Sequence, residues 1–249
     1  MKAIGAIAAV LLIANTGFAA EIPQADRRSG SDFMKPDTKA MQDEDTANPG
    51  MLWVLDGEAS WKKKAGSADK ACADCHGDAA VTMKGVAARY PAMVDGKLTT
   101  LEQQVRHKAP QLGYESRDLL ALTAFVAKQS RGMPIEVEVS NRTRPSIDRG
   151  NEFFHRRQGQ LNLACAQCHD ANWGKKLAGT PVPQAHPTGY PLYRLEWQNV
   201  GSITRRFRNC LTGMRAELLP HGAPELVDLE LYLMWRARGM KMEAPAVRP

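Results

Sequence analysis

The motif Cys-x-x-Cys-His occurs twice in this chain of 249 residues, and it constrains the fold more than any other feature. The copies are "CADCH" at 72–76 and "CAQCH" at 165–169. In this pattern the two thiols bond covalently to the vinyl groups of haem, and the histidine binds the iron. The sequence therefore predicts two haem c groups, attached through Cys72, Cys75, Cys165 and Cys168, with His76 and His169 as iron ligands.

Two other interpretations of the cysteine pairs are weaker. A zinc ribbon places its pairs about 15–20 residues apart, whereas Cys75 and Cys165 are 90 positions apart. A redox pair of the thioredoxin type does not require a following histidine, and both copies here have one. The doubled motif thus favours haem.

The first twenty residues indicate export. Residues 1–20 contain Lys2, an apolar run over 4–13 and the small residues Ala19 and Ala20, which is the pattern of a cleavable signal peptide. Bacterial haem attachment to this motif follows export, so we expect a periplasmic protein. Later in the chain no apolar stretch of about 18 residues predicts a membrane span. Because of export, the net charge of +6 favours an anionic substrate or an acidic partner over nucleic acid.

The two halves of the chain repeat the same pattern. Five positions before and within the motifs match at a spacing of 93, from Gly57 and Trp61 in the first half to Gly150 and Phe154 in the second. Two closing segments, 119–133 and 226–240, match at a spacing of 107 and have the wide apolar stripe of a packed helix. Only 6% of the residues are aromatic, and two haems would supply the missing apolar bulk.

These repeats predict an all-α fold with two cytochrome c-like domains in tandem. The expected order is a signal peptide (1–20), an extended N-terminal arm (21–49), a first domain (50–140) and a second domain (141–249), which holds the active site.

The second ligand of each iron is the next question. A downstream methionine is common in small cytochromes, but the methionines here are better explained as core packing. Cys210, 41 positions after His169, is a stronger candidate in the second half. Its four fellow cysteines are used by the motifs, and an unpaired thiol is unusual in an exported protein. Arginines at 205, 206, 208 and 215 surround it in the sequence, which favours the thiolate.

Several stretches carry a family resemblance over nearly the whole mature chain. They are "TLEQQVR", "QSRGMPIEVEV", "RRFRNCLTGMRAE", "ELYLMWRARGM" and the ending "EAPAVRP". With Arg-x-x-x-Cys placed after the second haem motif, the chain resembles SoxA, the dihaem subunit of the SoxAX cytochrome of thiosulfate oxidation. The resemblance implies that Cys210 ligates the active-site haem, carries a persulfide and bonds covalently to thiosulfate sulfur. It also implies that Arg206 binds the substrate.

One position departs from the family. Dihaem members usually have a second axial cysteine shortly after the stretch that corresponds to 101–103, and this chain has none there. His107 is our expected replacement, which would make the first haem bis-His. Lys108, which follows it at about the position where the cysteine would fall, or a methionine remains open.

The resemblance implies a specific reaction and specific partners. Thiosulfate would be joined oxidatively to a cysteine of the SoxYZ carrier protein, and two electrons would pass to the SoxX monohaem cytochrome in a heterodimer. Two other functions stay open, a thiosulfate dehydrogenase that forms tetrathionate and a dihaem electron carrier in which Cys210 is structural.

Overall fold

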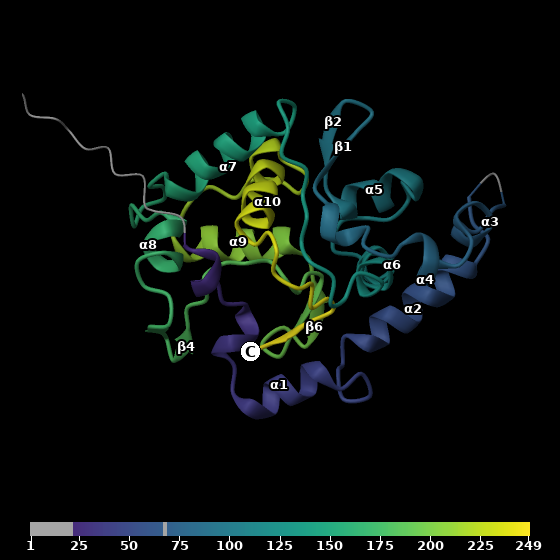
Figure 1. Ribbon diagram of the computed structural model, residues 1–249, viewed down its shortest axis with the longest axis horizontal. Helices are drawn as coiled ribbons and strands as arrows, with labels where there is room; N and C mark the ends of the chain where they lie inside the picture. Colours follow the sequence, from purple (N-terminus) through teal and green to yellow (C-terminus); the bar gives the residue numbers. More distant parts are fainter. Residues whose placement is uncertain (1–21, 67–68) are drawn as a thin grey trace, which may run out of the picture.

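The computed structural model describes residues 22–66 and 69–249, which form two helical halves (Figure 1). In the first half, helix α2 (Met51–Lys62) packs against α6 (Arg117–Lys128). In the second half, α7 (Arg144–His155) packs in the same way against α10 (Pro224–Arg236). The prediction of a mostly helical fold built from two repeated units is confirmed.

The remaining helices are shorter, and they carry the haem motifs and the segments around them. They are η1 (Gln24–Asp26), η2 (Gly30–Phe33), α1 (Pro36–Asp43), α3 (Cys72–His76), α4 (Ala79–Thr82), η3 (Ala87–Arg89), α5 (Leu101–Lys108), α8 (Cys165–His169) and α9 (Ile203–Gly213).

A glycine lies at the contact of each long helix pair. A Cβ atom on Gly57 of α2 would lie 2.1 Å from the carbonyl oxygen of Ala121 on α6. A Cβ atom on Gly150 of α7 would lie 2.2 Å from the carbonyl oxygen of Asp228 on α10. Separations this short leave no room for a side chain, so both pairs bring their backbones into direct contact. Gly57 and Gly150, which match in the sequence repeat, therefore both allow a helix pair to pack closely.

The two closing helices begin at residues that favour a helix start. Ser116 caps α6, since its side chain accepts a hydrogen bond from the backbone N–H of Leu119. Pro224 is the first residue of α10, where its missing N–H costs nothing. The segments 119–133 and 226–240 continue past these helices into turns.

Short strands add three small sheets to the helices, which sequence reasoning did not predict. The hairpin of β1 (Ala92–Val94) and β2 (Lys97–Thr99) precedes α5. A second hairpin, β3 (Lys176–Leu177) and β4 (Thr180–Pro181), follows the second motif. In the third sheet, β5 (Leu192–Arg194) pairs antiparallel with β6 (Asn199–Gly201) and parallel with β7 (Val247–Arg248). The hairpins before α5 and α9 fix where those two helices begin.

The described part of the N-terminal arm lies along the end of the chain. The hydroxyls of Ser29 and Ser31 donate to Glu243 at 2.7 and 3.0 Å. The amide of Asn48 donates to the carbonyl oxygen of Pro245 at 3.0 Å. Figure 1 shows α1 beneath the second half, close to the C-terminus. The arm is thus fastened to the second half by buried and half-buried polar contacts.

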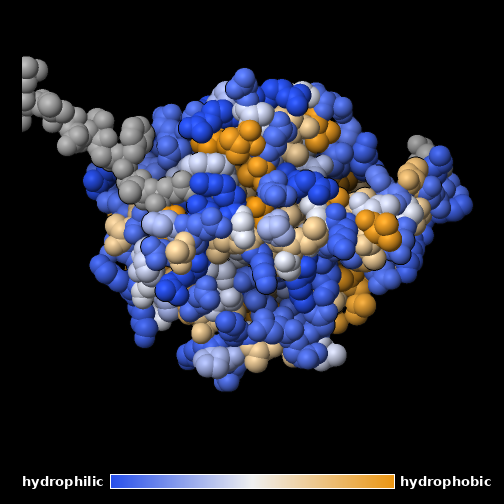
Figure 2. All heavy atoms as spheres, in the orientation of Figure 1, coloured by the Kyte–Doolittle hydropathy of each residue, from blue (hydrophilic) through white to orange (hydrophobic). Residues whose placement is uncertain are grey.

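Within residues 22–66 and 69–249, no helix has the length and apolar character needed to cross a bilayer. The face shown in Figure 2 is mostly hydrophilic, and its apolar residues form small separate groups. The predicted signal peptide lies outside the described residues.

Candidate functional site

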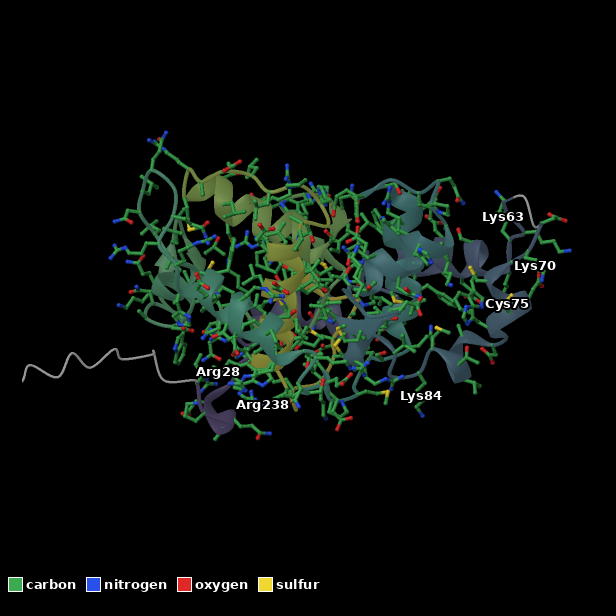
Figure 3. The ribbon with its side chains drawn as sticks, turned by 90° about the horizontal axis from the view of Figure 1, so that it is seen from above. Arg28, Lys63, Lys70, Cys75, Lys84 and Arg238 are labelled. Atoms are coloured by element: carbon green, nitrogen blue, oxygen red, sulfur yellow. The ribbon has the colours of Figure 1, made fainter. Side chains whose placement is uncertain are left out.

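The first motif forms α3 at an exposed end of the molecule. Figure 3 shows Cys75 there, near Lys63 and Lys70. Cys72 packs against the core cluster of the first half, whereas Cys75 and His76 are exposed. The ring of Trp61 lies 5.7 Å from that of His76, and its indole N–H donates to the carbonyl oxygen of Gly77 at 3.1 Å. An aromatic residue of α2 thus flanks the motif histidine.

The second motif, α8, is built in the same way but is less exposed. Phe154, the repeat partner of Trp61, has its ring 6.4 Å from that of His169. The Nδ1 atom of His169 lies 2.6 Å from the carbonyl oxygen of Pro183. Because a carbonyl only accepts, Nδ1 must donate, so Nε2 is the ring nitrogen that remains for another partner. A motif histidine held in this tautomer is prepared to bind a metal.

Helix α9 brings Cys210 to His169. Ser202 caps the helix by accepting from the N–H of Arg205 at 3.1 Å. Ile203 and Phe207, at helical spacing before Cys210, are buried in the core cluster against which Cys165 packs. Cys210 follows on the same face and lies within hydrogen-bonding reach of the His169 side chain. Residues 41 positions apart in the sequence therefore meet at the second motif.

The surroundings of Cys210 favour its thiolate. Burial raises the pKa of this thiol, but the hydrogen bond with His169 and the charges of Arg206 and Arg194 outweigh it and bring the pKa to about 7. Cys165 lies close by, and its pKa is raised to about 12, chiefly by burial and then by the charge of Cys210. The pKa values of the two nearby thiols are thus shifted in opposite directions, and Cys210 is the one that ionises readily.

Of the arginines near Cys210 in the sequence, Arg206 is the one whose charge acts on it in the structure. Burial lowers the pKa of Arg206, but the charges of Cys210 and Tyr190 leave it raised overall. Arg205 instead stacks on the ring of Trp197, 4.3 Å from its centroid. Arg208 donates to the carbonyl oxygen of Leu219. Helix α9 therefore directs its three arginines to three different places.

Arg194 on β5 is a site residue that sequence reasoning missed. Its side chain is only 12% exposed, and burial followed by the charge of Arg206 lowers its pKa. Its Nε–H is buried and has no partner, although its Nη2 lies 3.3 Å from the carboxylate of Glu196. A buried cation with an unused donor beside Arg206 and Cys210 is suited to bind an oxyanion. Arg194 lies 16 positions before Cys210, so no local sequence pattern indicated that the two side chains would be close.

The residues at the second motif fit a haem. Two thiols in Cys-x-x-Cys spacing lie beside a histidine whose Nδ1 is held by the carbonyl oxygen of Pro183. Cys210, whose thiol ionises readily, lies next to this histidine and would be available as a second ligand to a haem iron. A thiolate and an imidazole facing one another are a donor set that iron accepts. The sequence-predicted residues Cys165, Cys168, His169 and Cys210 are therefore brought together with Arg206.

The first motif has a different neighbourhood. Leu101 and Val105 of α5 pack against the same core cluster as Cys72. His107 and Lys108 lie at the end of this helix, and both are exposed. The assignment of His107 as an iron ligand stays a prediction.

A small cavity of about 50 Å³ lies between the two halves. Its lining is mostly apolar but includes Glu102 of α5 and Glu230 of α10. Burial raises the pKa of each to about 8, with a further increase from the charge of Glu115 for Glu102 and from Glu102 for Glu230. One carboxyl oxygen of Glu102 is buried without a partner. These two acids therefore hold protons that exposed carboxyls would release.

Comparison with known proteins places the chain in a family. The profile of the SoxA/TsdA cytochrome c domain matches residues 56–135 and 149–242. The chain is 37% identical over 229 residues to the L-cysteine S-thiosulfotransferase subunit SoxA of Rhodovulum sulfidophilum, covering 89% of this chain and 80% of that protein. It is 36% identical to the subunit of the same name from Pseudaminobacter salicylatoxidans, over 88% of this chain and 80% of the relative.

A solved structure agrees with this assignment. SoxXA from P. pantotrophus superimposes with a TM-score of 0.86 at 29% identity, over 90% of this chain and 87% of that chain. The 90% coverage of this chain includes both halves, so the repeated fold is shared as a whole. The chain is a member of the SoxA/TsdA cytochrome c family.

Proposed function

We propose that this chain is the SoxA-type subunit of an L-cysteine S-thiosulfotransferase, which joins thiosulfate to a cysteine of a SoxYZ carrier protein. The observation that carries the proposal is the meeting of Cys210 with His169, with Arg206 and Arg194 beside the thiol. The names of the relatives support the same reaction.

The two arginines bind the substrate in this mechanism. Thiosulfate is a dianion with a sulfonate end and a terminal sulfur. Arg206 and Arg194 donate hydrogen bonds to the sulfonate oxygens, each a charge-assisted contact. The terminal sulfur is then directed at Cys210. Both cations act on Cys210 already, so they also favour the thiolate that reacts.

Cys210 forms the first sulfur–sulfur bond. Its thiolate and the terminal sulfur of thiosulfate join, and two electrons leave. Haem c, when bound at the second motif, supplies an iron that accepts electrons. The carrier cysteine, as a thiolate, then attacks the thiosulfate-derived sulfur and displaces the Cys210 thiolate. The carrier leaves as a cysteine S-thiosulfonate, and the net reaction releases two electrons for each thiosulfate.

The remaining features of the proposal concern cofactors, partner and location. The two motifs hold two haem c groups, through Cys72 and Cys75 and through Cys165 and Cys168. The electrons pass to a SoxX monohaem cytochrome, for which the SoxXA structure of the relative is the support. Residues 1–20 are a signal peptide, and the mature protein acts in the periplasm.

The test uses the full chain purified with its SoxX partner, together with SoxYZ and thiosulfate. The mass of the carrier should increase by one thiosulfonate group with the natural chain and stay unchanged with Cys210→Ala. Full conjugation by Cys210→Ala would overturn the mechanism. Tetrathionate formed without SoxYZ, at a rate above that of conjugation, would instead make the protein a thiosulfate dehydrogenase.

A further inference from the structure

The same local structure precedes helix α5 in the first half and helix α9 in the second half. In each half a short antiparallel hairpin, β1–β2 or β5–β6, is followed by a capped helix, α5 or α9. Thr100 caps α5 by accepting from the N–H of Gln103, and Ser202 caps α9 by accepting from the N–H of Arg205. These caps are equivalent positions, from which the two helices can be aligned residue by residue.

Counting from the caps pairs Cys210 with Lys108. Cys210 is the eighth residue after Ser202, and Lys108 is the eighth residue after Thr100. His107 pairs instead with Asn209. His107 and Lys108 are both exposed, so the register rather than burial distinguishes them. Counting from the helix caps therefore distinguishes Lys108 from His107, which the sequence left as alternative ligands.

The packed face of each helix agrees with this alignment. In α9, Ile203 and Phe207 are buried in the cluster against which Cys165 packs, and Cys210 continues that face. In α5, Leu101 and Val105 pack against the cluster that also receives Cys72 and Ala73. A residue three after Val105 continues this face, because an α-helix turns roughly 100° per residue. That residue is Lys108, whereas His107 lies roughly 200° around the helix from Val105.

We infer that Lys108, rather than His107, is the residue that stands toward the first motif as Cys210 stands toward the second, and that its amine is the second iron ligand of a haem held there. The inference rests on the proposal that the first motif holds a haem. A lysine amine binds a metal in its neutral form, so ligation releases one proton to water. The exposed, flexible side chain at the last turn of α5 is free to adopt the position that the ligand needs.

Two matched variants of adjacent residues test the inference. Lys108→Ala and His107→Ala each remove one candidate from the same turn of α5. The full chain with SoxX is produced for each, and its low-spin haem signals are recorded by electron paramagnetic resonance and near-infrared magnetic circular dichroism. Lys108→Ala should convert one low-spin signal to a high-spin or altered one and leave the Cys210-linked signal in place. His107→Ala should leave both signals unchanged, and Lys108→Met should give a new methionine-type signal.

The outcomes separate this inference from the proposed function. Loss of a signal in His107→Ala, with none in Lys108→Ala, would overturn the lysine assignment and restore the histidine. Unchanged spectra in both variants would exclude both residues. Mass measurement of the peptide that contains Cys72 and Cys75 shows independently whether a haem is attached there. A peptide without haem would refute this inference, while the sulfur chemistry at Cys210 would remain to be judged by carrier conjugation.

Discussion

Gly150 of α7 lies against the backbone of Asp228 on α10, so closely that a Cβ atom on the glycine would be 2.2 Å from the carbonyl oxygen. Gly57 and Ala121 repeat this contact in the first half, at 2.1 Å. The motif helices pack against these helix pairs, because α3 contacts α2 and α8 contacts α7.

Replacing Gly150 with Ala should destabilise the second half. The new methyl group has no space, so the helices must separate, and overpacking of this kind costs about 1–3 kcal/mol. Each kcal/mol should lower the midpoint of thermal unfolding by about 2–4 °C in a chain of this size. Gly113→Ala is the control, because an added Cβ there meets nothing within 4 Å. An unchanged midpoint for Gly150→Ala would show that the helices do not pack this closely.

Arg206→Ala and Arg194→Ala should each weaken thiosulfate use. Each variant removes a charge-assisted hydrogen bond, about 1.5–3 kcal/mol, which corresponds to roughly a tenfold to hundredfold loss in kcat/KM. The loss should appear mainly in KM, with the haem spectrum nearly unchanged. Arg205→Ala, a control from the same helix, removes a cation that stacks on Trp197 and should have little effect. Loss of the thiolate signal in Arg206→Ala would instead mean that this arginine holds the Cys210 helix in place.

Stability should depend on pH through Glu102. Its pKa is about 8 in the folded protein and about 4.5 when unfolded, so the folded state binds the extra proton between these values. Stability therefore falls as pH rises from about 4.5 to about 8 and then levels off. Glu102→Gln removes this titration, and its unfolding midpoint should exceed that of the natural protein by more at pH 9 than at pH 5. The exposed Glu217→Gln should show no such widening, and an equal difference at both pH values would contradict the assignment.

Breaking the ion pair of Arg236 and Asp170 should destabilise the second motif. The Arg236 side chain is 5% exposed and donates to Asp170, the residue after His169, at 2.6 Å. Arg236→Met leaves a half-buried carboxylate without its cation, a change that costs about 3–5 kcal/mol when a buried pair is broken. Thermal unfolding measures the effect. The exposed pair of Arg144 and Asp148 is the comparison, and Arg144→Met should cost at most about 1 kcal/mol.

The sequence was sufficient for the features that depend on local pattern. Apolar periodicity located the helices α6 and α10. The Cys-x-x-Cys-His pattern located the segments that form α3 and α8, although not their helical structure. Cys210 could be found because it is a lone thiol among arginines. These features are readable because each depends on neighbours within one or two helical turns.

Features that depend on chain geometry could not be predicted in this way. Arg194 reaches the site from a three-residue strand, whose position depends on pairing with β6 and β7. Lys108 lies at about the position where the family's cysteine would fall, but its register against Cys210 could not be counted from the sequence. The loop of the β5–β6 hairpin is two residues longer than that of β1–β2. No local sequence pattern reveals that difference in length.

The contacts of the arm with Glu243 and Pro245 join residues that are up to 214 positions apart. The second half is therefore contacted by a segment that precedes the first half in the chain, so its surface combines residues from both sides of the first half. Contacts of such high sequence separation form late and slow folding. A fragment that begins at the second domain would leave the serine partners of Glu243 behind, and a chain that lacks its last residues would release the arm. The contacts between the arm and residues 243–245 can therefore form only after both of these segments have been synthesised.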